Sequence, residues 1–191
     1  MSMEGKVVAI SGGASGIGLA TAKLISSRGA IVCISDVDPT ALKGAESHFN
    51  PLNVPFTVTR VDVAKRSDVD SWIHGIVEKY GRLDGAVNAA GIIGKYHGIT
   101  QLADVEDDEW DRIIAVNLTG LMYCLRAELK RISDRGSIVN ISSIQGVMGI
   151  LLSFLIDDQG LICTRFPRKC SILCEQARRG WADSMYGEGS R

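Results

Sequence analysis

A glycine-rich turn, Ser11-Gly12-Gly13-Ala14-Ser15-Gly16-Ile17-Gly18, carries the strongest chemical signal in the sequence. It follows an apolar, β-branched run at 6–11 that predicts a buried strand, and it precedes apolar residues at helical spacing. Gly12 permits a tight turn, Gly16 lets the backbone approach a ligand, and Gly18 lets the helix pack on the strand. Because the N–H groups at the start of a helix bind phosphate, the turn predicts a site for a phosphate-bearing ligand.

An acidic residue, Asp36, closes the second predicted strand, eighteen residues after Gly18. A carboxylate at that place can bind the ribose hydroxyls of an adenosine dinucleotide, and it would repel a 2′-phosphate. The turn and Asp36 together predict a dinucleotide site that prefers NAD to NADP. The alternative is that Asp36 is only a turn residue at the end of a strand.

Strands and helices alternate along the first three quarters of the chain. Strands are predicted at 6–11, 31–35, 56–63, 83–89 and 137–141, and helices are predicted between them. The third helix should be capped by Ser67, and the last, with an acidic first turn, carries an apolar stripe from Trp110 to Leu129. This alternation predicts an α/β protein with a Rossmann-type, doubly wound parallel sheet, helices on both faces, and an incomplete C-terminal end.

Length and composition favour one soluble domain. The chain has 191 residues, 46 % of them hydrophobic, and a formal net charge of −1, so neither nucleic acid nor a membrane is an expected partner. No signal peptide is apparent, and the longest apolar run, 149–156, is too short to cross a bilayer, so we expect a cytoplasmic protein. The five cysteines predict neither a disulfide framework nor a metal site. We expect a dinucleotide-binding domain at 1–149 and an atypical, irregular tail at 150–191.

Further motifs follow the turn in a fixed order. They are Asp62-Val63, then Asn88-Ala89-Ala90-Gly91, then Asn117, and finally Ser143 after Asn140-Ile141-Ser142. With the turn, they resemble the short-chain dehydrogenase/reductase family from Lys6 to about Gly146. In that family the pair that Asp62-Val63 matches contacts adenine, and the asparagine and serine that Asn117 and Ser143 match belong to a catalytic tetrad. The N-terminal half is also similar to fungal members that act on terpenoid or polyketide intermediates.

The resemblance implies an oxidoreductase that transfers a hydride between NAD, or NADP, and an alcohol or ketone substrate such as a natural-product intermediate. It implies catalytic roles for Ser143 and Asn117. The cofactor-binding residues that it implies, together with the turn and Asp36, are Ser11, Gly12, Ser15, Gly16, Ile17, Gly18, Asp36, Asp62, Val63, Asn88, Ala89 and Gly91.

The sequence departs from the family pattern after Ser143. Members carry a catalytic Tyr about a dozen residues later and a Lys four residues after it, where this chain has Ile156 and Gly160, and no Tyr-x-x-x-Lys occurs anywhere in it. Members usually form homo-oligomers through the helix that carries this pair, so its absence argues against an oligomer here. Three interpretations stay open: an active NAD(P)-dependent enzyme, a truncated dinucleotide-binding protein without dehydrogenase activity, and a tail produced by a frameshift or retained intron.

Overall fold

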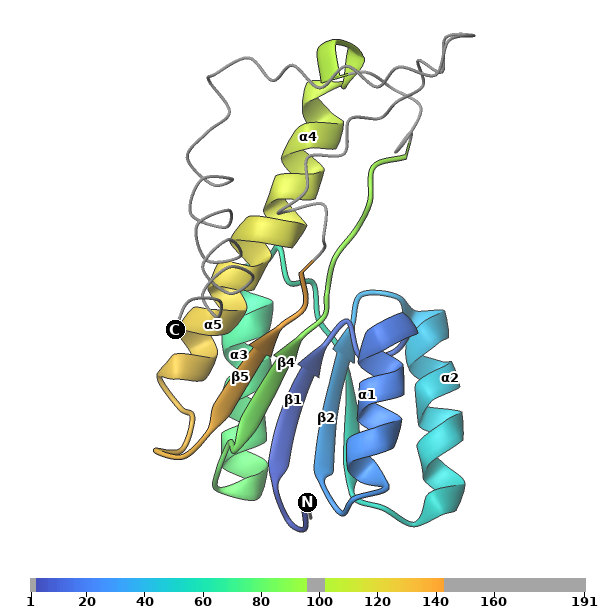
Figure 1. Ribbon diagram of the computed structural model, residues 1–191, viewed down its shortest axis with the longest axis vertical. Coiled ribbons are helices and arrows are strands. Elements are labelled where there is room, and N and C mark those ends of the chain that lie inside the picture. The colour runs from blue at the N-terminus through green and yellow to red at the C-terminus, as the bar shows by residue number, and fades with distance from the viewer. Residues whose placement is uncertain (1–2, 96–101, 143–191) are drawn as a thin grey trace, which may run out of the picture. The chain divides into compact units, whose positions relative to one another are not determined.

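Five parallel strands form the central sheet of the protein (Figure 1). The computed structural model describes residues 3–95 and 102–142. The strands, in chain order, are β1 (Val7–Ser11), β2 (Ile31–Asp36), β3 (Phe56–Arg60), β4 (Gly85–Asn88) and β5 (Ser137–Asn140). They lie in the order β3-β2-β1-β4-β5, and every neighbouring pair is parallel. This order confirms the predicted doubly wound sheet, with β1 at its centre and a change of direction between β1 and β4.

Helices cover both faces of the sheet (Figure 1). On one face lie α1 (Gly16–Ser26) and α2 (Pro39–Phe49), which pack on Val8, Ile10 and their neighbours in β2. On the other lie α3 (Arg66–Tyr80) and a long helix composed of α4 (Asp107–Ile114), the π-helical segment η3 (Ala115–Gly120) and α5 (Leu121–Leu129). Two short 3₁₀ turns, η1 (Asn50–Leu52) and η2 (Leu102–Asp104), complete the elements of the described part. None of the helices in residues 3–95 and 102–142 is long and apolar enough to span a membrane.

Two predicted boundaries around β3 are wrong. The strand ends at Arg60 rather than Val63, because Asp62 forms a turn in which its carboxylate accepts from the N–H of Ala64 at 3.1 Å. Helix α3 then begins with Lys65 as its N-cap residue, and no side chain caps it. The predicted cap, Ser67, lies inside the first turn, where its hydroxyl donates to the carboxylate of Asp68 at 3.3 Å.

None of the fully buried residues of the long helix belongs to its predicted apolar stripe. Gly120, Cys124, Ala127 and Glu128 are buried, whereas the stripe residues Trp110, Leu118, Met122 and Leu129 are exposed. The helix lies so close to the loop after β3 that a Cβ at Gly120 would be 3.0 Å from Cγ2 of Val63. Close approach of the backbone, and not side-chain hydrophobicity, therefore decides which face of this helix is buried.

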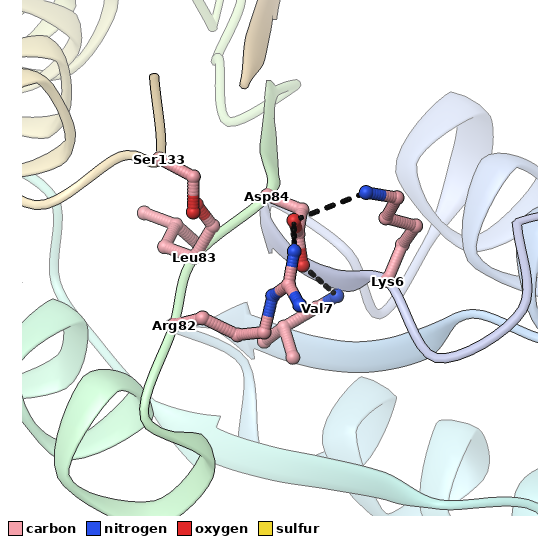
Figure 2. Close-up of polar contacts among 6 residues, drawn as sticks. All are labelled: Lys6, Val7, Arg82, Leu83, Asp84 and Ser133. Carbon is pink, nitrogen blue, oxygen red and sulfur yellow. Dashed lines mark hydrogen bonds and ion pairs between the residues drawn. The ribbon is translucent and has the colours of Figure 1, made fainter. Parts of the chain in front are cut away.

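A nearly buried carboxylate, that of Asp84, ties together the amino-terminal ends of β1 and β4 (Figure 2). Its Oδ2 accepts from the N–H of Val7 at 3.0 Å, and its Oδ1 pairs with Lys6 Nζ at 3.4 Å and with the guanidinium of Arg82. Burial pushes the pKa of Asp84 upward, but the hydrogen bonds from Arg82, Val7 and Lys6 outweigh it and hold the pKa below its usual range. Asp84 therefore stays charged at neutral pH.

Backbone hydrogen bonds extend this link to β5. The carbonyl of Asp84 accepts from the N–H of Ser137 at 3.2 Å. The carbonyl of Leu83 accepts from both the N–H and the hydroxyl of Ser133, at 2.9 and 3.0 Å (Figure 2). These bonds hold β1, β4 and β5 together at the amino-terminal edge of the sheet. The loops that follow the strands lie at the opposite, carboxyl-terminal edge. The unit that contains the sheet runs from Met1 to Ile141. The predicted boundary at 149 and the tail at 150–191 lie outside the described residues.

A second buried polar cluster lies beneath the carboxyl-terminal edge. The Asn88 side chain accepts from the Ser11 hydroxyl at 3.2 Å and donates to Asn140 Oδ1 at 3.1 Å and to Glu128 Oε2 at 3.0 Å. The three hydrogen bonds connect the ends of β1, β4 and β5 with α5. Burial raises the pKa of Glu128 from 4.5 to about 7, and the hydrogen bond from Asn88 offsets only part of this effect.

This raised pKa makes folding stability depend on pH. Burial makes the folded protein favour protonated Glu128. The contribution of this residue to folding stability is therefore complete below pH 4.5, its ordinary pKa, and is lost as the pH rises through about 7. The full loss is on the order of 3 kcal/mol. Replacement Glu128→Gln removes the ionisation, so the stability of the variant relative to the wild type should be greater at pH 8 than at pH 5.

Urea unfolding of both chains at the two pH values measures this difference. Replacement Glu46→Gln, on the exposed surface of α2, is the matched control and should behave as the wild type at both pH values. If the relative stability of Glu128→Gln were the same at pH 5 and pH 8, Glu128 would not titrate in this range and the prediction would be wrong.

Candidate functional site

A cleft of about 480 Å³ opens at the carboxyl-terminal edge of the sheet, where the strand order changes direction between β1 and β4. This is the place at which open parallel sheets bind their ligands, and the volume lies within the usual range for small-molecule sites. The residues that line it are Gly12, Ser15, Gly16, Ile17, Gly18, Ser35, Asp36, Val37, Val61, Asp62, Val63, Ala89, Ala90, Gly91, Ile92, Val116 and Ile141.

The glycine-rich turn leaves no room for a side chain at Gly12 or at Gly18. Gly12 has a φ of +62°, and a Cβ on it would lie 2.6 Å from the backbone nitrogen of Ala90. A Cβ on Gly18 would collide with the carbonyl oxygen of Gly12. The sequence predicts that Gly18 allows close packing of the helix on the strand. In the structure, the atoms nearest to Gly18 belong to Gly12 and Gly13 of the turn itself. The turn holds the start of α1 directly over the cleft.

The first turn of α1 presents unpaired N–H groups to the cleft. Its N-cap residue, Ser15, makes no side-chain capping hydrogen bond, and the first bond of the helix runs from the N–H of Leu19 to the carbonyl of Ser15 at 3.0 Å. The N–H groups of Gly16, Ile17 and Gly18 therefore have no partner within the helix. With the positive end of the helix dipole, they form a site suited to an anionic group such as phosphate.

The carboxylate of Asp36 lies on the same cleft and is held in place by backbone groups. One oxygen accepts from the N–H of Ala14 at 3.3 Å, and the other accepts from the N–H of Asp38 at 3.2 Å. The first of these bonds ties the end of β2 to the glycine-rich turn. Asp36 therefore has a fixed position beside the phosphate site, with acceptor capacity left for hydroxyl donors.

The Asp62-Val63 pair forms another wall of the cleft. The Asp62 side chain pairs with Lys65 at 3.6 Å, and Val63 is buried with 8 % of its surface exposed. Two other predicted binding residues, Ser11 and Asn88, do not line the cleft. They are buried beneath it, where the Ser11 hydroxyl donates to Asn88, and they support Ala89 and Gly91, which do line it.

Asn117, expected to be catalytic, lies in the π-helical segment η3 and contacts the cleft wall. Its side-chain oxygen accepts from the N–H of Ile92, and its side-chain nitrogen donates to the Ile92 carbonyl, both at 2.8 Å. Asn117 thus fixes the loop after β4, and π-helical turns are frequent at functional sites. Ser143, the other expected catalytic residue, lies outside the described residues, which end one position earlier.

Sequence analysis missed seven residues of the cleft. They are Ser35, Val37, Val61, Ala90, Ile92, Val116 and Ile141. Ala90 and Ile141 lie inside recognised motifs, and each of the other five lies directly beside a residue of one. Their side chains are mostly small or apolar, so only their place within or beside a motif could have marked them as candidates.

Comparisons with known proteins agree with this geometry. The family model described as short chain dehydrogenase matches residues 6–153. Short-chain dehydrogenase/reductase ABA4 of Pyricularia oryzae is 55 % identical over 150 residues, which are 78 % of this chain and 56 % of that protein. Chanoclavine-I dehydrogenase of Aspergillus fumigatus is 41 % identical over 157 residues, 76 % of this chain and 59 % of the relative.

Among solved structures, a short chain dehydrogenase from Mycobacterium smegmatis has a TM-score of 0.69 at 37 % identity, and the match covers 75 % of this chain and 59 % of that one. Levodione reductase has a TM-score of 0.70 at 31 % identity, covering 76 % and 57 %. The chain spans less than two thirds of the length of these relatives. The family match and the fungal relatives confirm the family that the motifs indicated, and the chain belongs to the short-chain dehydrogenase/reductase family.

Proposed function

We propose that this chain binds a nicotinamide adenine dinucleotide in the cleft, with NAD preferred to NADP, as the nucleotide-binding part of an oxidoreductase. The family generally uses such cofactors. The observation that carries the proposal is that the unpaired N–H groups of Gly16, Ile17 and Gly18 line the same cleft as the Asp36 carboxylate. A phosphate site beside a fixed ribose acceptor is the combination that a dinucleotide requires.

Each part of the cofactor has a candidate partner in the cleft. The pyrophosphate would be held by the first turn of α1, the adenosine ribose by Asp36, and the adenine by Asp62 and Val63. The backbone at Ala89 and Gly91 would line the site beyond the glycine-rich turn. These residues lie in the loop that Asn117 fixes. When bound, the nicotinamide supplies hydride transfer, and the protein supplies binding and orientation.

For the whole protein we propose hydride transfer between this cofactor and an alcohol or ketone, with a natural-product intermediate as the substrate. The support is the similarity to chanoclavine-I dehydrogenase and ABA4, whose matches cover 59 % and 56 % of those proteins. In this proposal Ser143 binds the substrate oxygen, and Asn117 acts through the loop at Ile92.

The preference for NAD depends on Asp36. Its negative charge accepts from the ribose hydroxyls and repels a 2′-phosphate, so NAD should bind more tightly than NADP. Replacement Asp36→Asn should weaken NAD binding by about tenfold or more, since charge-assisted hydrogen bonds contribute about 1.5–3 kcal/mol, and it should narrow the difference between the cofactors. Calorimetric titration of the 191-residue chain with each dinucleotide measures both effects.

Replacement Asp111→Asn, at an exposed position of α4, changes the net charge equally and should leave both affinities unchanged. Tighter binding of NADP than of NAD by the wild type would contradict the assigned role of Asp36. Binding of neither cofactor would contradict the proposed function.

A second candidate function is dinucleotide binding without turnover, and one observation favours it. The chain contains no Tyr-x-x-x-Lys, so the proton that accompanies hydride transfer has no recognised donor or acceptor. General acid–base catalysis is worth on the order of 10²–10⁴-fold in rate. We therefore expect little or no reduction of NAD by the purified chain with a panel of secondary alcohols, followed by absorbance of the reduced cofactor. Robust turnover that disappears in Ser143→Ala would show that another residue supplies the proton transfer.

A further inference from the structure

An arginine at the end of β3 lies beside the ribose corner of the cleft. Arg60 is the register partner of Asp36 across the β2–β3 pair, so the two side chains start from the same face of the sheet. The Nε of Arg60 donates to the carbonyl of Val37 at 3.3 Å. Val37 directly follows Asp36 and lines the cleft, so this bond holds the guanidinium at the rim.

The charge of Arg60 is not used elsewhere in the described part of the chain. Arg60 is exposed, and the salt bridges found within residues 3–95 and 102–142 do not include it. No salt bridge found within those residues joins Arg60 to Asp36, whose oxygens accept from the N–H groups of Ala14 and Asp38. The rim therefore carries a fixed carboxylate and an anchored guanidinium on adjacent strands, each held separately by backbone groups.

These two charges act in opposite directions on a phosphate at the ribose 2′ position. The carboxylate repels it, whereas a guanidinium whose Nε is already bonded has its two terminal nitrogens left to donate to phosphate oxygens. An arginine near the ribose acceptor is also the group that accommodates a 2′-phosphate in dinucleotide-binding folds.

We propose that Arg60 is a specificity-determining residue that binds the 2′-phosphate of NADP at the rim of the cleft and so limits the preference for NAD. The proposal rests on the proposed dinucleotide-binding function. In this proposal, discrimination between NAD and NADP depends on two residues, because Asp36 repels the 2′-phosphate and Arg60 binds it.

Replacement Arg60→Gln tests the proposal in the wild-type and the Asp36→Asn backgrounds. Calorimetric titrations use NAD, NADP, and two fragments that differ only in the 2′-phosphate, adenosine 5′-monophosphate and adenosine 2′,5′-bisphosphate. Arg60→Gln should weaken binding of NADP and of the bisphosphate by about three- to tenfold, the range for an exposed charge pair with hydrogen bonds. Binding of NAD and of the monophosphate should change by less than about twofold, as for an ordinary surface substitution.

In the Asp36→Asn background, where NADP is no longer repelled, the loss of NADP affinity caused by Arg60→Gln should be clearest. Replacement Arg60→Lys should keep part of that affinity, because lysine retains the charge without the fork of donors. Replacement Lys43→Gln, at an exposed position of α2, removes the same charge away from the rim and should change no affinity. The effect of Arg60→Gln on NADP should shrink as salt is raised.

Equal losses for NAD and NADP, or no loss for either, would overturn the role of Arg60 while leaving the proposed function standing. An Asp36→Asn chain that binds NAD but no NADP would overturn it as well. If the wild-type chain bound neither NAD nor the monophosphate, the proposed function would fail, and the role of Arg60 would fail with it.

Discussion

The close contact between the glycine-rich turn and the end of β4 is the constraint on which the site depends. β1 pairs with β2 on one side and with β4 on the other, so the chain that leaves β1 must cross the end of the sheet where the strand order changes direction. Gly12 makes this passage with a φ of +62°, in direct contact with the backbone of Ala89 and Ala90. No other residue type has both the conformation and the size for this position. The contact places the start of α1, with its unpaired N–H groups, over the cleft.

Polar groups hold the sheet at both of its edges, and the two arrangements differ in electrostatics. At the amino-terminal edge, Asp84 is charged and surrounded by donors, and its pKa is held below its usual range. At the carboxyl-terminal edge, burial raises the pKa of Glu128 to about 7, and Asn88 donates a hydrogen bond to its carboxyl group. Asn88 also forms hydrogen bonds with Ser11 and Asn140, the last residues of β1 and β5. The residues that line the cleft therefore begin from strand ends whose relative positions are fixed.

Much of this arrangement could be predicted from sequence because it depends on local patterns. Buried parallel strands are continuous apolar runs, as in Val7–Ser11, and glycine spacing together with Asp36 marks the turn and the ribose acceptor. The buried face of the long helix could not be predicted, since Gly120, Ala127 and Glu128 are buried by the proximity of other elements, and hydropathy points to Leu118 and Met122 instead.

Roles that depend on a distant partner were also hidden from sequence. Ser11 and Asn88 belong to motifs of the binding site, but their side chains bond to each other beneath the cleft instead of lining it. Ser67 has the right residue type for a cap, yet α3 begins before it because the Asp62 turn brings the chain into the helix earlier. Such outcomes are set by tertiary packing and by hydrogen bonds between elements, which residue type and spacing do not encode.

The most direct test of the account follows the backbone amides of the ¹⁵N-labelled chain by NMR while NAD is added. The account predicts that the largest shifts occur at Gly16, Ile17 and Gly18, with further shifts at Asp36 and Ala89, and that amides at the opposite edge of the sheet, such as Val7 and Asp84, stay unchanged. Saturable binding of NAD that left the first turn of α1 unperturbed, or that shifted the opposite edge instead, would contradict the placement of the dinucleotide in this cleft.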